Sequence, residues 1–200
     1  ASHAAVTDQM IQNDAKTGAD VLTWGLGTQG QRYSPLKQVN VGTVGRMSPA
    51  WAFSFGGEKQ RGQESQPVIH NGKMFVTASY SRLFALDAAT GRIAWKVFNT
   101  GPDADVGIGA DFHPFYAGDR GKDLGKTTWP PDAWKIGGGT VWGWISYDPK
   151  LNLIFHGTGN PGPWNADQRP GDNKWTAGMF ARDPDTGAAH WFQGFSPHDL

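Results

Sequence analysis

The sequence predicts an all-β fold built from short strands and tight turns. Three observations predict it. The 200 residues include 10 Trp, 28 Gly and 13 Pro, a composition that supplies bulky aromatic groups for sheet packing and many turn formers. Runs of β-forming residues alternate with turn signals along the chain. One strand-turn-strand phrase occurs twice in register, which indicates a repeated sheet unit.

Charge and cysteine content exclude several classes of function. Lys and Arg together number 18 and so do Asp and Glu, so there is no net field to attract nucleic acid or an anionic membrane surface. The apolar stretches are too short to span a bilayer. Because the chain contains no Cys, it has no disulfides, thiolate metal sites or thiol nucleophiles. Any chemistry must come from oxygen and nitrogen groups or from a cofactor.

The first elements in order are a short helix and a meander of three strands. Residues 7–13 predict one or two helical turns behind a Thr7 cap, ended by Gly18. Strand-forming runs separated by turns follow at residues 74–78, 83–86 and 92–97. Because each turn is short, we expect these strands to pair as an antiparallel meander. A further hairpin is expected from residues 142–148 and 153–156.

The repeated phrase suggests how the sheets are arranged. Phe84-Ala85-x-Asp87-x-x-Thr90-Gly91-x-x-x-Trp95 returns, 96 residues later, as Phe180-Ala181-x-Asp183-x-x-Thr186-Gly187-x-x-x-Trp191. The Asp can accept backbone N–H bonds across the turn, Gly supplies a positive φ, and Trp closes the returning strand against a neighbour. Propeller blades of about 40–50 residues place two blade lengths in this offset. A β-propeller is therefore the leading fold, with about three to four blades available from this length.

The whole chain is expected to form one partial propeller domain, residues 1–200. Residues 16–98 would be its first blade region, 99–139 an insertion or deletion junction, and 140–200 a further blade region. The stretch 99–139 shows no period and is long for a structureless loop. Residues 161–174 are predicted to leave the sheet as a long loop, the kind of segment that often carries function.

Several short motifs favour ordinary structural roles. Gly25-x-Gly27-x-x-Gly30 matches a dinucleotide fingerprint, but Pro35 follows where a helix would be needed, so a turn is favoured. An Asp103-x-Asp105 start lacks the rest of a calcium loop. The six His have no zinc-ligand spacing. Motifs of serine hydrolases, zincins and P-loop enzymes are also missing from the sequence.

Three segments could instead bind a flat ligand and a cation. In the Gly-rich stretch 137–144, Trp142 and Trp144 alternate, so a strand would place both indoles on one face, where a conjugated ring could lie. Asn160 could ligate a hard cation at a strand end. Glu64 stands in a polar run before the strand pair at 68–78. The alternatives are two Trp in a propeller core, an Asn in an ordinary turn and a solvated surface Glu.

Taken together, the longer phrases resemble the quinoprotein alcohol dehydrogenases, which are pyrroloquinoline quinone (PQQ) enzymes. The similar phrases, from about residue 16 to the end, are QRYSPL at 31–36, RGQESQP at 61–67, the repeated blade motif, GGGT at 137–140, WGW at 142–144, GTGNPGPWN at 157–165 and RPGDNKW at 169–175. The stretch from Gly101 onward is most similar to the lanthanide-type methanol dehydrogenases. Residues 16–97 are also similar to the ethanol dehydrogenases.

This resemblance implies an eight-bladed propeller with PQQ on its axis beside a calcium or lanthanide ion. Trp142 would be the floor under PQQ, Thr140 and Glu64 would bond its polar edge, and Asn160 would ligate the metal. In such enzymes the metal polarises the quinone, a carboxylate takes the alcohol proton, hydride passes to the quinone and a cytochrome c collects the electrons. The resemblance also implies a primary alcohol substrate, methanol or ethanol, and a periplasmic location.

The sequence departs from this family in ways that bear on activity. Family subunits are several-fold longer, and this chain passes from its first blade motif, near Asn99, to the segment before Trp142. The skipped blades would carry the adjacent cysteine pair and a glutamate that ligates the metal. The catalytic aspartate of the family would lie just beyond Leu200, so no catalytic residue is assigned. We therefore expect a chain that is internally deleted and truncated at its C-terminus, and inactive alone.

Other functions remain open on the sequence. Blade motifs of this kind also suit a non-enzymatic propeller scaffold or binding module, and the Trp-rich composition would suit carbohydrate binding, although no motif supports it. An incomplete ring leaves open sheet edges, which favour self-association and make a homodimer possible.

Overall fold

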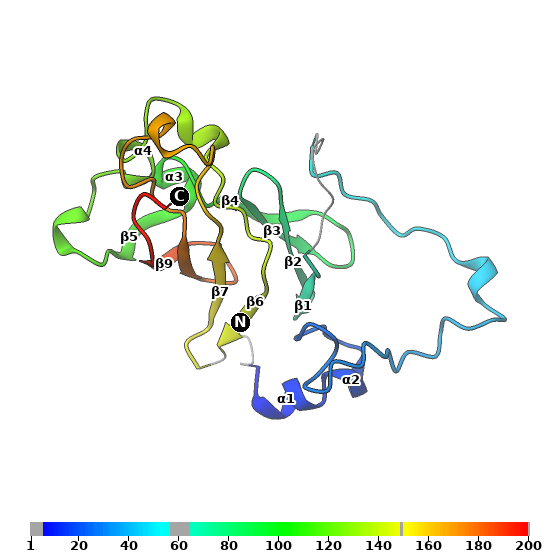
Figure 1. The fold of residues 1–200 in the computed structure, drawn as a ribbon. Coiled ribbons are helices and arrows are strands. Elements are labelled where there is room, and N and C mark those ends of the chain that lie inside the picture. Colours follow the sequence, from blue (N-terminus) through cyan, green and yellow to red (C-terminus); the bar gives the residue numbers. More distant parts are fainter. Residues whose placement is uncertain (1–5, 57–64, 149, 200) are drawn as a thin grey trace.

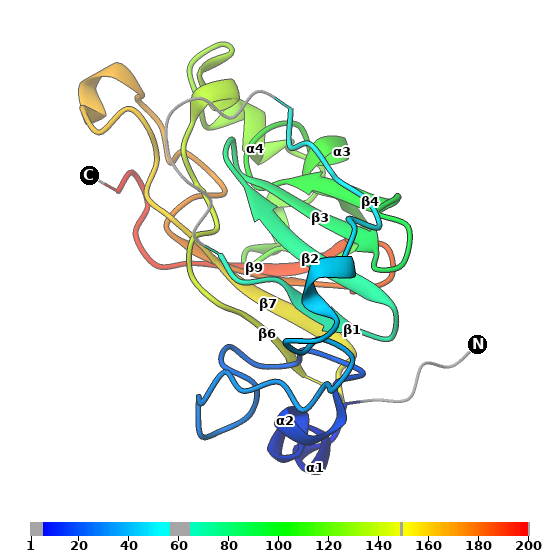
Figure 2. The same ribbon diagram turned by 90° about the vertical axis from the view of Figure 1, so that its right-hand side faces the viewer.

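The computed structural model describes residues 6–56, 65–148 and 150–199, and these form two β-sheets that pack face to face. Figures 1 and 2 show the first sheet packed against the second, with the N-terminal helices below both, and Figure 1 shows a long arm that reaches away from the sheets. Within this described part of the chain, no helix is long and apolar enough to cross a membrane.

The first sheet is an antiparallel meander in the order β1-β2-β3-β4. Its strands are β1 (Val68–His70), β2 (Lys73–Ala78), β3 (Arg82–Asp87) and β4 (Ile93–Phe98). This confirms the predicted meander, with β1 pairing on its outer side. Beyond β1, the backbone of Val21 bridges to Ile69, so the N-terminal segment covers that edge.

The second sheet has five strands in the order β5-β9-β8-β7-β6. Its strands are β5 (Ile108–His113), β6 (Ile145–Asp148), β7 (Leu153–Thr158), β8 (Gly178–Arg182) and β9 (Ala189–Gly194). The β6–β7 pair is the predicted hairpin, although β6 begins three residues later than expected. Strand β5 pairs with β9 in parallel, whereas all other neighbours are antiparallel.

Short helices occupy the connections. They are α1 (Asp8–Gln12), α2 (Asp14–Thr17), η1 (Val44–Arg46), α3 (Asp103–Val106), η2 (Ala117–Asp119), α4 (Leu124–Thr127), η3 (Ala133–Ile136) and η4 (Ala166–Gln168). Helix α1 begins as predicted, with the Thr7 side chain accepting a bond from the Met10 amide. The glycines at 25, 27 and 30 have positive φ and form a turn, so the dinucleotide interpretation fails.

The repeated phrase has the same local geometry in both sheets. In each repeat the Asp carboxylate accepts from the backbone N–H of the Thr three residues later, at 2.8 Å for Asp87–Thr90 and 2.8 Å for Asp183–Thr186. The following Gly has φ +70° or +77°. Each repeat also shifts register at the same point, after Ala85 and after Ala181. The turn chemistry predicted from the sequence is confirmed.

A tryptophan from one unit docks on the turn of the next. Trp51 donates its indole N–H to the Ala88 carbonyl at 3.1 Å, and a Cβ on Gly91 would lie 2.6 Å from its ring. In the second repeat Trp95 donates to the Pro184 carbonyl at 3.0 Å, and a Cβ on Gly187 would lie 2.7 Å from its ring. Glycine is therefore needed at this position for its positive φ and also for the space that the indole takes.

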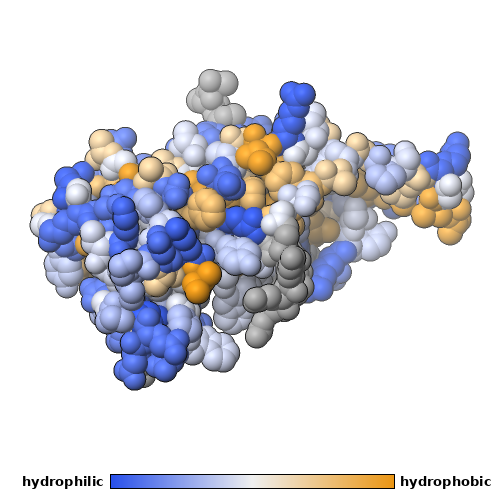
Figure 3. Space-filling model, turned by 90° about the horizontal axis from the view of Figure 1, so that it is seen from above, coloured by the Kyte–Doolittle hydropathy of each residue, from blue (hydrophilic) through white to orange (hydrophobic). Residues whose placement is uncertain are grey.

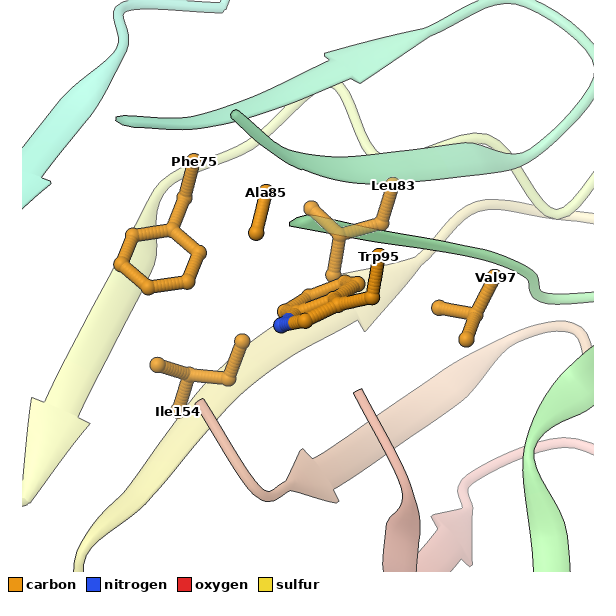
Figure 4. Packing of buried hydrophobic residues seen from close by; sticks show 6 residues of the cluster. All are labelled: Phe75, Leu83, Ala85, Trp95, Val97 and Ile154. Atoms are coloured by element: carbon orange, nitrogen blue, oxygen red, sulfur yellow. The ribbon is translucent and has the colours of Figure 1, made fainter. Parts of the chain in front are cut away.

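The docked Trp95 side chain is part of the hydrophobic core between the two sheets. Phe75, Leu83, Ala85, Trp95 and Val97 of the first sheet are buried with Ile154 of β7, and Figure 4 shows the Trp95 indole lying between its own sheet and Ile154. Burying these side chains is the main favourable contribution to association of the sheets. Two units that lie 96 residues apart in sequence are thus direct neighbours.

The segment 99–139 is more ordered than the sequence suggested. It contains α3, β5, α4 and two short 3₁₀ turns, and β5 adds a fifth strand to the second sheet. Residues Val106 and Phe112 from this segment are buried against Phe180 and Phe192. The pattern of residues within 99–139 could not predict this ordered structure, because the segment is held by contacts with β8 and β9. The interpretation of this segment as an insertion or a deletion junction stays a prediction.

The described residues form two sheets, fewer than the three or four blades that the length predicts. Among the residues that lie outside both sheets is the arm, residues 31–50, which forms no strand. Its exposed apolar side chains are Tyr33, Leu36, Val39, Val41, Val44 and Met47. The arm is the extension on the right in Figure 3, where orange and blue atoms alternate. The partial, all-β propeller architecture is otherwise as predicted, and the sheets do not close into a ring.

Candidate functional site

The candidate site is built where the glycine-rich stretch before β6 pairs with the segment after β7. Gly159 donates its N–H to the Thr140 carbonyl at 3.0 Å, and Gly139 donates to the Asn160 carbonyl at 3.0 Å. A Cβ on Gly138 would lie 2.6 Å from the Asn160 carbonyl oxygen. Glycine is required there because the two backbones approach so closely.

Two buried polar side chains of the first sheet hold this glycine-rich stretch in place. The Ser81 hydroxyl donates to the Gly138 carbonyl, and the Asn99 amide donates to the Gly139 carbonyl at 3.1 Å. Neither residue was singled out from the sequence as part of a site. Both flank the first repeat, at the two ends of the β3–β4 hairpin, and only the packing of the sheets reveals their role.

Trp142 presents an open indole beside this backbone pair. Its ring atoms lie 3.1 Å and 3.6 Å from the position of a Cβ on Gly159, and 69% of the residue is exposed. A side chain at 159 would collide with the ring edge. The interpretation of Trp142 as a buried core residue is therefore wrong, and its face is accessible to a planar ligand.

Asn160 lies one residue from the glycine that contacts Trp142. Its side chain is exposed and its Nδ2 donates to the Pro161 carbonyl at 3.2 Å. Neither its Oδ1 nor the Thr140 hydroxyl makes a hydrogen bond within the described ranges. The structure thus brings Thr140, Trp142 and Asn160 to one place, and each of the two polar side chains keeps an acceptor available.

The donor set around Asn160 is small. A calcium-like ion takes six to eight oxygen ligands, and no group of three or more His, Cys, Asp or Glu that could hold a metal occurs among the residues that the structure describes. Asn160 can supply one amide oxygen, and neighbouring carbonyls could add to it. The described residues therefore fit a planar ring better than they fit a complete metal site.

Glu64, the fourth residue predicted for the site, lies outside the described residues. Its neighbour Ser65 is described, and the Thr77 hydroxyl donates to it at 2.6 Å. Thr77 belongs to β2 and is buried, close in sequence to the Ser81 that holds the glycine-rich stretch. The prediction for Glu64 remains a prediction.

Trp144 does not share a strand face with Trp142, contrary to expectation. Residues 141–144 are outside any strand, and the chain bends at Gly143. Trp144 stacks on Trp24 with ring centroids 5.5 Å apart, and the Arg32 guanidinium covers the Trp24 ring at 3.8 Å. The pairing of Thr140 with Gly159 fixes Trp142, whereas the N-terminal segment captures Trp144.

A buried arginine anchors the loop that follows Asn160. Arg169 is fully buried, and its guanidinium donates to the Pro163 carbonyl at 2.6 Å and to the Asn173 side chain at 2.7 Å. It also donates to the Asp199 carbonyl. These bonds join both ends of the loop 161–174, which fixes the backbone that carries Asn160.

A second buried arginine supports the sheet below the site. Arg182 donates to the carbonyls of Val106 and Gly187, at 2.6 Å and 3.1 Å, and to His156 Nε2 at 3.1 Å. Burial lowers the pKa of Arg182 to about 9. Burial first, and then the Arg182 charge, lower the pKa of His156 to about 3. His156 is therefore neutral at ordinary pH and accepts the arginine N–H.

Comparison with protein families matches most of the chain. The family model described as glucose/ethanol/alcohol dehydrogenase, beta-propeller domain, matches residues 22–107 and 105–200. Both matches include one copy of the repeated phrase and together include Thr140, Trp142 and Asn160.

Individual proteins with similar sequences and structures agree. Quinoprotein alcohol dehydrogenase PedH of Pseudomonas putida KT2440 is 35% identical over 298 aligned residues, which cover 100% of this chain and 50% of PedH. Methanol dehydrogenase [cytochrome c] subunit 1 of Methylobacterium organophilum is 54% identical over 117 residues, covering 58% and 19% of the two chains. A solved europium-containing methanol dehydrogenase is 28% identical, with a TM-score of 0.54 over 96% of this chain and 51% of that one.

These alignments also locate a difference in length. This chain spans about half of PedH, and an alignment 298 residues long contains all 200 residues of this chain. PedH therefore has further residues inside the matched range, as the expected internal deletion requires. The repeated phrase, the two stacked sheets and the match of the family model to nearly all of the chain establish that this chain belongs to the PQQ-dependent quinoprotein alcohol dehydrogenase family, in its β-propeller domain.

Proposed function

We propose that the surface formed by Thr140, Trp142 and Asn160 is part of a PQQ-binding site, in which Trp142 is the platform under the ring. The observation that carries the proposal is the exposed indole of Trp142 held against Gly159, one residue from Asn160. The Thr140 hydroxyl can bond the polar edge of the ring, and Asn160 Oδ1 can face its cation. Glu64 is proposed to bond the same edge.

The residues present fit a flat, polar-edged group for three reasons. The indole is largely exposed, glycines on both sides let a planar molecule approach the backbone, and the two acceptors beside it have no other partner among the described residues. When bound, PQQ supplies the redox capacity for oxidising an alcohol, and the neighbouring ion acts as a Lewis acid. The protein's own contribution at this surface is support, orientation and one oxygen ligand.

We propose further that the substrate class is a primary alcohol such as methanol or ethanol, and that a cytochrome c accepts the electrons. The names of the relatives support both, since two are methanol dehydrogenases and one of these is named with cytochrome c. The europium-containing relative supports a lanthanide as the ion, with calcium as the alternative. A periplasmic location, as in the resembling family, belongs to the same proposal.

The 200-residue chain is proposed to bind PQQ without oxidising alcohols by itself. The hydrogen bonds of Thr140, Trp142 and Asn160 within the described residues involve no carboxylate that could take the alcohol proton. The same described residues hold one amide as the side-chain ligand for an ion. Binding and turnover are therefore separate questions for this chain.

Retention of PQQ tests the first part. The purified chain, mixed with PQQ and either calcium or lanthanum and then desalted, is expected to keep quinone absorbance, and Trp142→Ala to lose it. Trp164→Ala is the matched control, because Trp164 is 75% exposed and is not part of the proposed platform. Equal losses in the two variants, or no uptake by the unaltered chain, would refute the platform.

The ion ligand and the activity need their own measurements. Asn160→Ala is expected to weaken the ion dependence of PQQ retention while leaving the retention without ions unchanged. Dye reduction with methanol or ethanol is expected to stay at background for the chain with PQQ and ion. Sustained turnover would overturn the proposed inactivity. A chain that takes up no quinone would favour the scaffold function, for which the docked Trp51 and Trp95 are the supporting observation.

A further inference from the structure

A cavity lies at the junction of the two sheets and the N-terminal segment, away from the proposed PQQ surface. Its volume is about 400 Å³. It is lined by the N-terminal segment 6–28, by β1 and β2, by β6 with the residue before it, by β7, and by the turn after β8. The proposed PQQ surface follows the C-terminal end of β7, whereas this junction cavity lies at its N-terminal end. A cavity of this volume accommodates a small organic molecule.

Aromatic side chains form much of the cavity wall. Trp24 and Trp144 line it as a stacked pair, and Tyr147 lines it with its ring 5.7 Å from the His70 ring. Phe75 and other apolar side chains complete this wall. The faces and edges of such rings favour an aromatic guest over an aliphatic one of the same size.

Polar groups in the wall are mostly satisfied by one another. Lys73 forms an ion pair with Asp185, and the Tyr147 hydroxyl donates to Asn152 Oδ1 at 2.7 Å. Burial, followed by the charges of Asp185 and Asp148, raises the pKa of Tyr147, so that hydroxyl keeps its proton and its donor role. Among the lining residues that the structure describes, these pairs leave Lys73 and Asp185 matched to each other, which gives an ionic ligand no unbalanced charge there.

One buried polar atom in the lining lacks a partner. His70 Nδ1 lies 2.9 Å from Asp20 Oδ2, and the other carboxylate oxygen of Asp20 accepts from the Asn71 N–H. His70 Nε2 is buried and has no hydrogen-bond partner among the described residues. Because a carboxylate only accepts, we assign the hydrogen of the neutral ring to Nδ1, which leaves Nε2 as an acceptor. Such an atom usually has a water or ligand partner.

We propose that the junction cavity binds a small neutral aromatic molecule that carries a hydroxyl group. Its ring lies against Trp24, Trp144 and Tyr147, and its hydroxyl donates to His70 Nε2. The Asp20 carboxylate is a positioning group, since it fixes the imidazole orientation and tautomer. This site does not depend on the proposed PQQ function, because none of the residues assigned to PQQ lines the junction cavity.

Equilibrium dialysis with 2-naphthol tests the proposal directly. The unaltered 200-residue chain is expected to bind one equivalent near neutral pH, and to bind 2-naphthol about fivefold more tightly than 2-methoxynaphthalene, which has no hydroxyl donor. Absence of saturable 2-naphthol binding up to about 1 mM would overturn the proposal. Equal affinity for the two probes would show that the hydroxyl makes no hydrogen bond to His70, and would overturn the proposed specificity for a hydroxyl group.

Substitutions of matched tryptophans locate the binding. Trp24→Ala is expected to weaken 2-naphthol binding about tenfold, because it removes part of the aromatic wall and the ring on which Trp144 stacks. Trp164→Ala, which removes an exposed indole outside the cavity, is expected to leave the affinity unchanged. Circular dichroism confirms that both variants are folded before dialysis. Comparable losses in the two variants would indicate nonspecific stacking on exposed indoles and overturn the assignment.

Asp20→Asn tests the tautomer with little change of shape. The Asn amide would donate to His70 Nδ1, which moves the ring hydrogen to Nε2 and turns this atom into a donor. The preference for 2-naphthol over 2-methoxynaphthalene is then expected to fall from about fivefold to about one, because the ether oxygen can accept the new N–H. A merely structural role of Asp20 would weaken both probes equally, and that result would contradict the proposed hydrogen bond.

Discussion

The two repeats share one sequence phrase and one turn geometry, yet their tryptophans have different environments. Trp95 is 8% exposed and docks on the turn of the second repeat. Trp191, its equivalent, is half-buried and packs against Phe155 with ring centroids 5.7 Å apart. Local residues thus set the strand, the bulge and the turn. Burial of the indole depends on whether another unit follows in space.

The repeats also bury different kinds of side chain at one equivalent position. Leu86 precedes the Asp of the first repeat and is covered by an apolar layer that includes Phe53 and Phe55. Arg182 stands at the same place in the second repeat and donates to the carbonyl of Phe98, the last residue of β4, and to that of Val106 in α3. At this position the first repeat is therefore held by apolar contacts, whereas the second uses a buried cation beside a neutral histidine.

Removal of the docked tryptophan is expected to have the largest effect. Trp95→Ala should lower the free energy of unfolding by about 3–5 kcal/mol, because it empties the core between the sheets. Trp191→Ala should cost about 1–2 kcal/mol, since that ring is only half-buried. Urea unfolding followed by circular dichroism measures both. Equal costs would mean that docking adds nothing to the intrinsic stability of a repeat.

Acid should destabilise the second repeat selectively. The pKa of His156 is about 3 in the folded chain, against about 6.5 for an ordinary histidine. Between these values the unfolded chain binds one more proton, so stability is full above the upper value and is lost as the pH falls toward the lower one. This group alone accounts for a loss on the order of 5 kcal/mol at most.

His156→Gln checks the origin of that loss. A glutamine can accept the Arg182 N–H without titrating, so its unfolding free energy should fall less steeply between about pH 6.5 and pH 3. A pH dependence as steep as that of the unaltered chain would assign the effect to other groups.

Replacing the glycine under a docked indole should destabilise the chain more than replacing a glycine that only provides a positive φ in a turn. Gly187→Ala is expected to cost about 2–3 kcal/mol, because it adds a collision with the Trp95 ring to the penalty for a positive φ. Gly72→Ala is the control, since its φ is +74° with open space around the added carbon, and it should cost about 1 kcal/mol. Thermal unfolding compares the two. Similar shifts of the unfolding midpoint would show that the Trp95 ring moves away from the added carbon without loss of stability.

The smallest effect should be the same in both repeats. Asp87→Asn and Asp183→Asn each weaken the bonds to the following Thr without changing the shape of the turn. We expect two small and nearly equal losses in the unfolding midpoint, measured by urea titration. A larger loss for Asp183 would show that its turn depends on the docked Trp95 as well as on its local hydrogen bonds.

Local sequence was sufficient for much of the fold and for part of the site. Turn chemistry predicted the meander, the later hairpin and both repeats, because these contacts lie within a few residues of one another. The same reasoning identified Trp142 and Asn160 as residues of interest. It could not find Ser81 and Asn99, which reach the glycine-rich stretch across 57 and 40 residues of chain.

The amino-acid sequence by itself determined the strands, the turns, the repeat and the family, since these depend on neighbouring residues and on recognisable phrases. The tertiary structure alone decided that Trp95 is docked while Trp191 is not, that Trp142 is open while Trp144 is stacked on Trp24, and that segment 99–139 supplies a strand. The physical reason is that burial depends on which distant surfaces meet. Short-range hydrogen bonds shape each unit, but the neighbour that covers it is set by the packing of the whole chain.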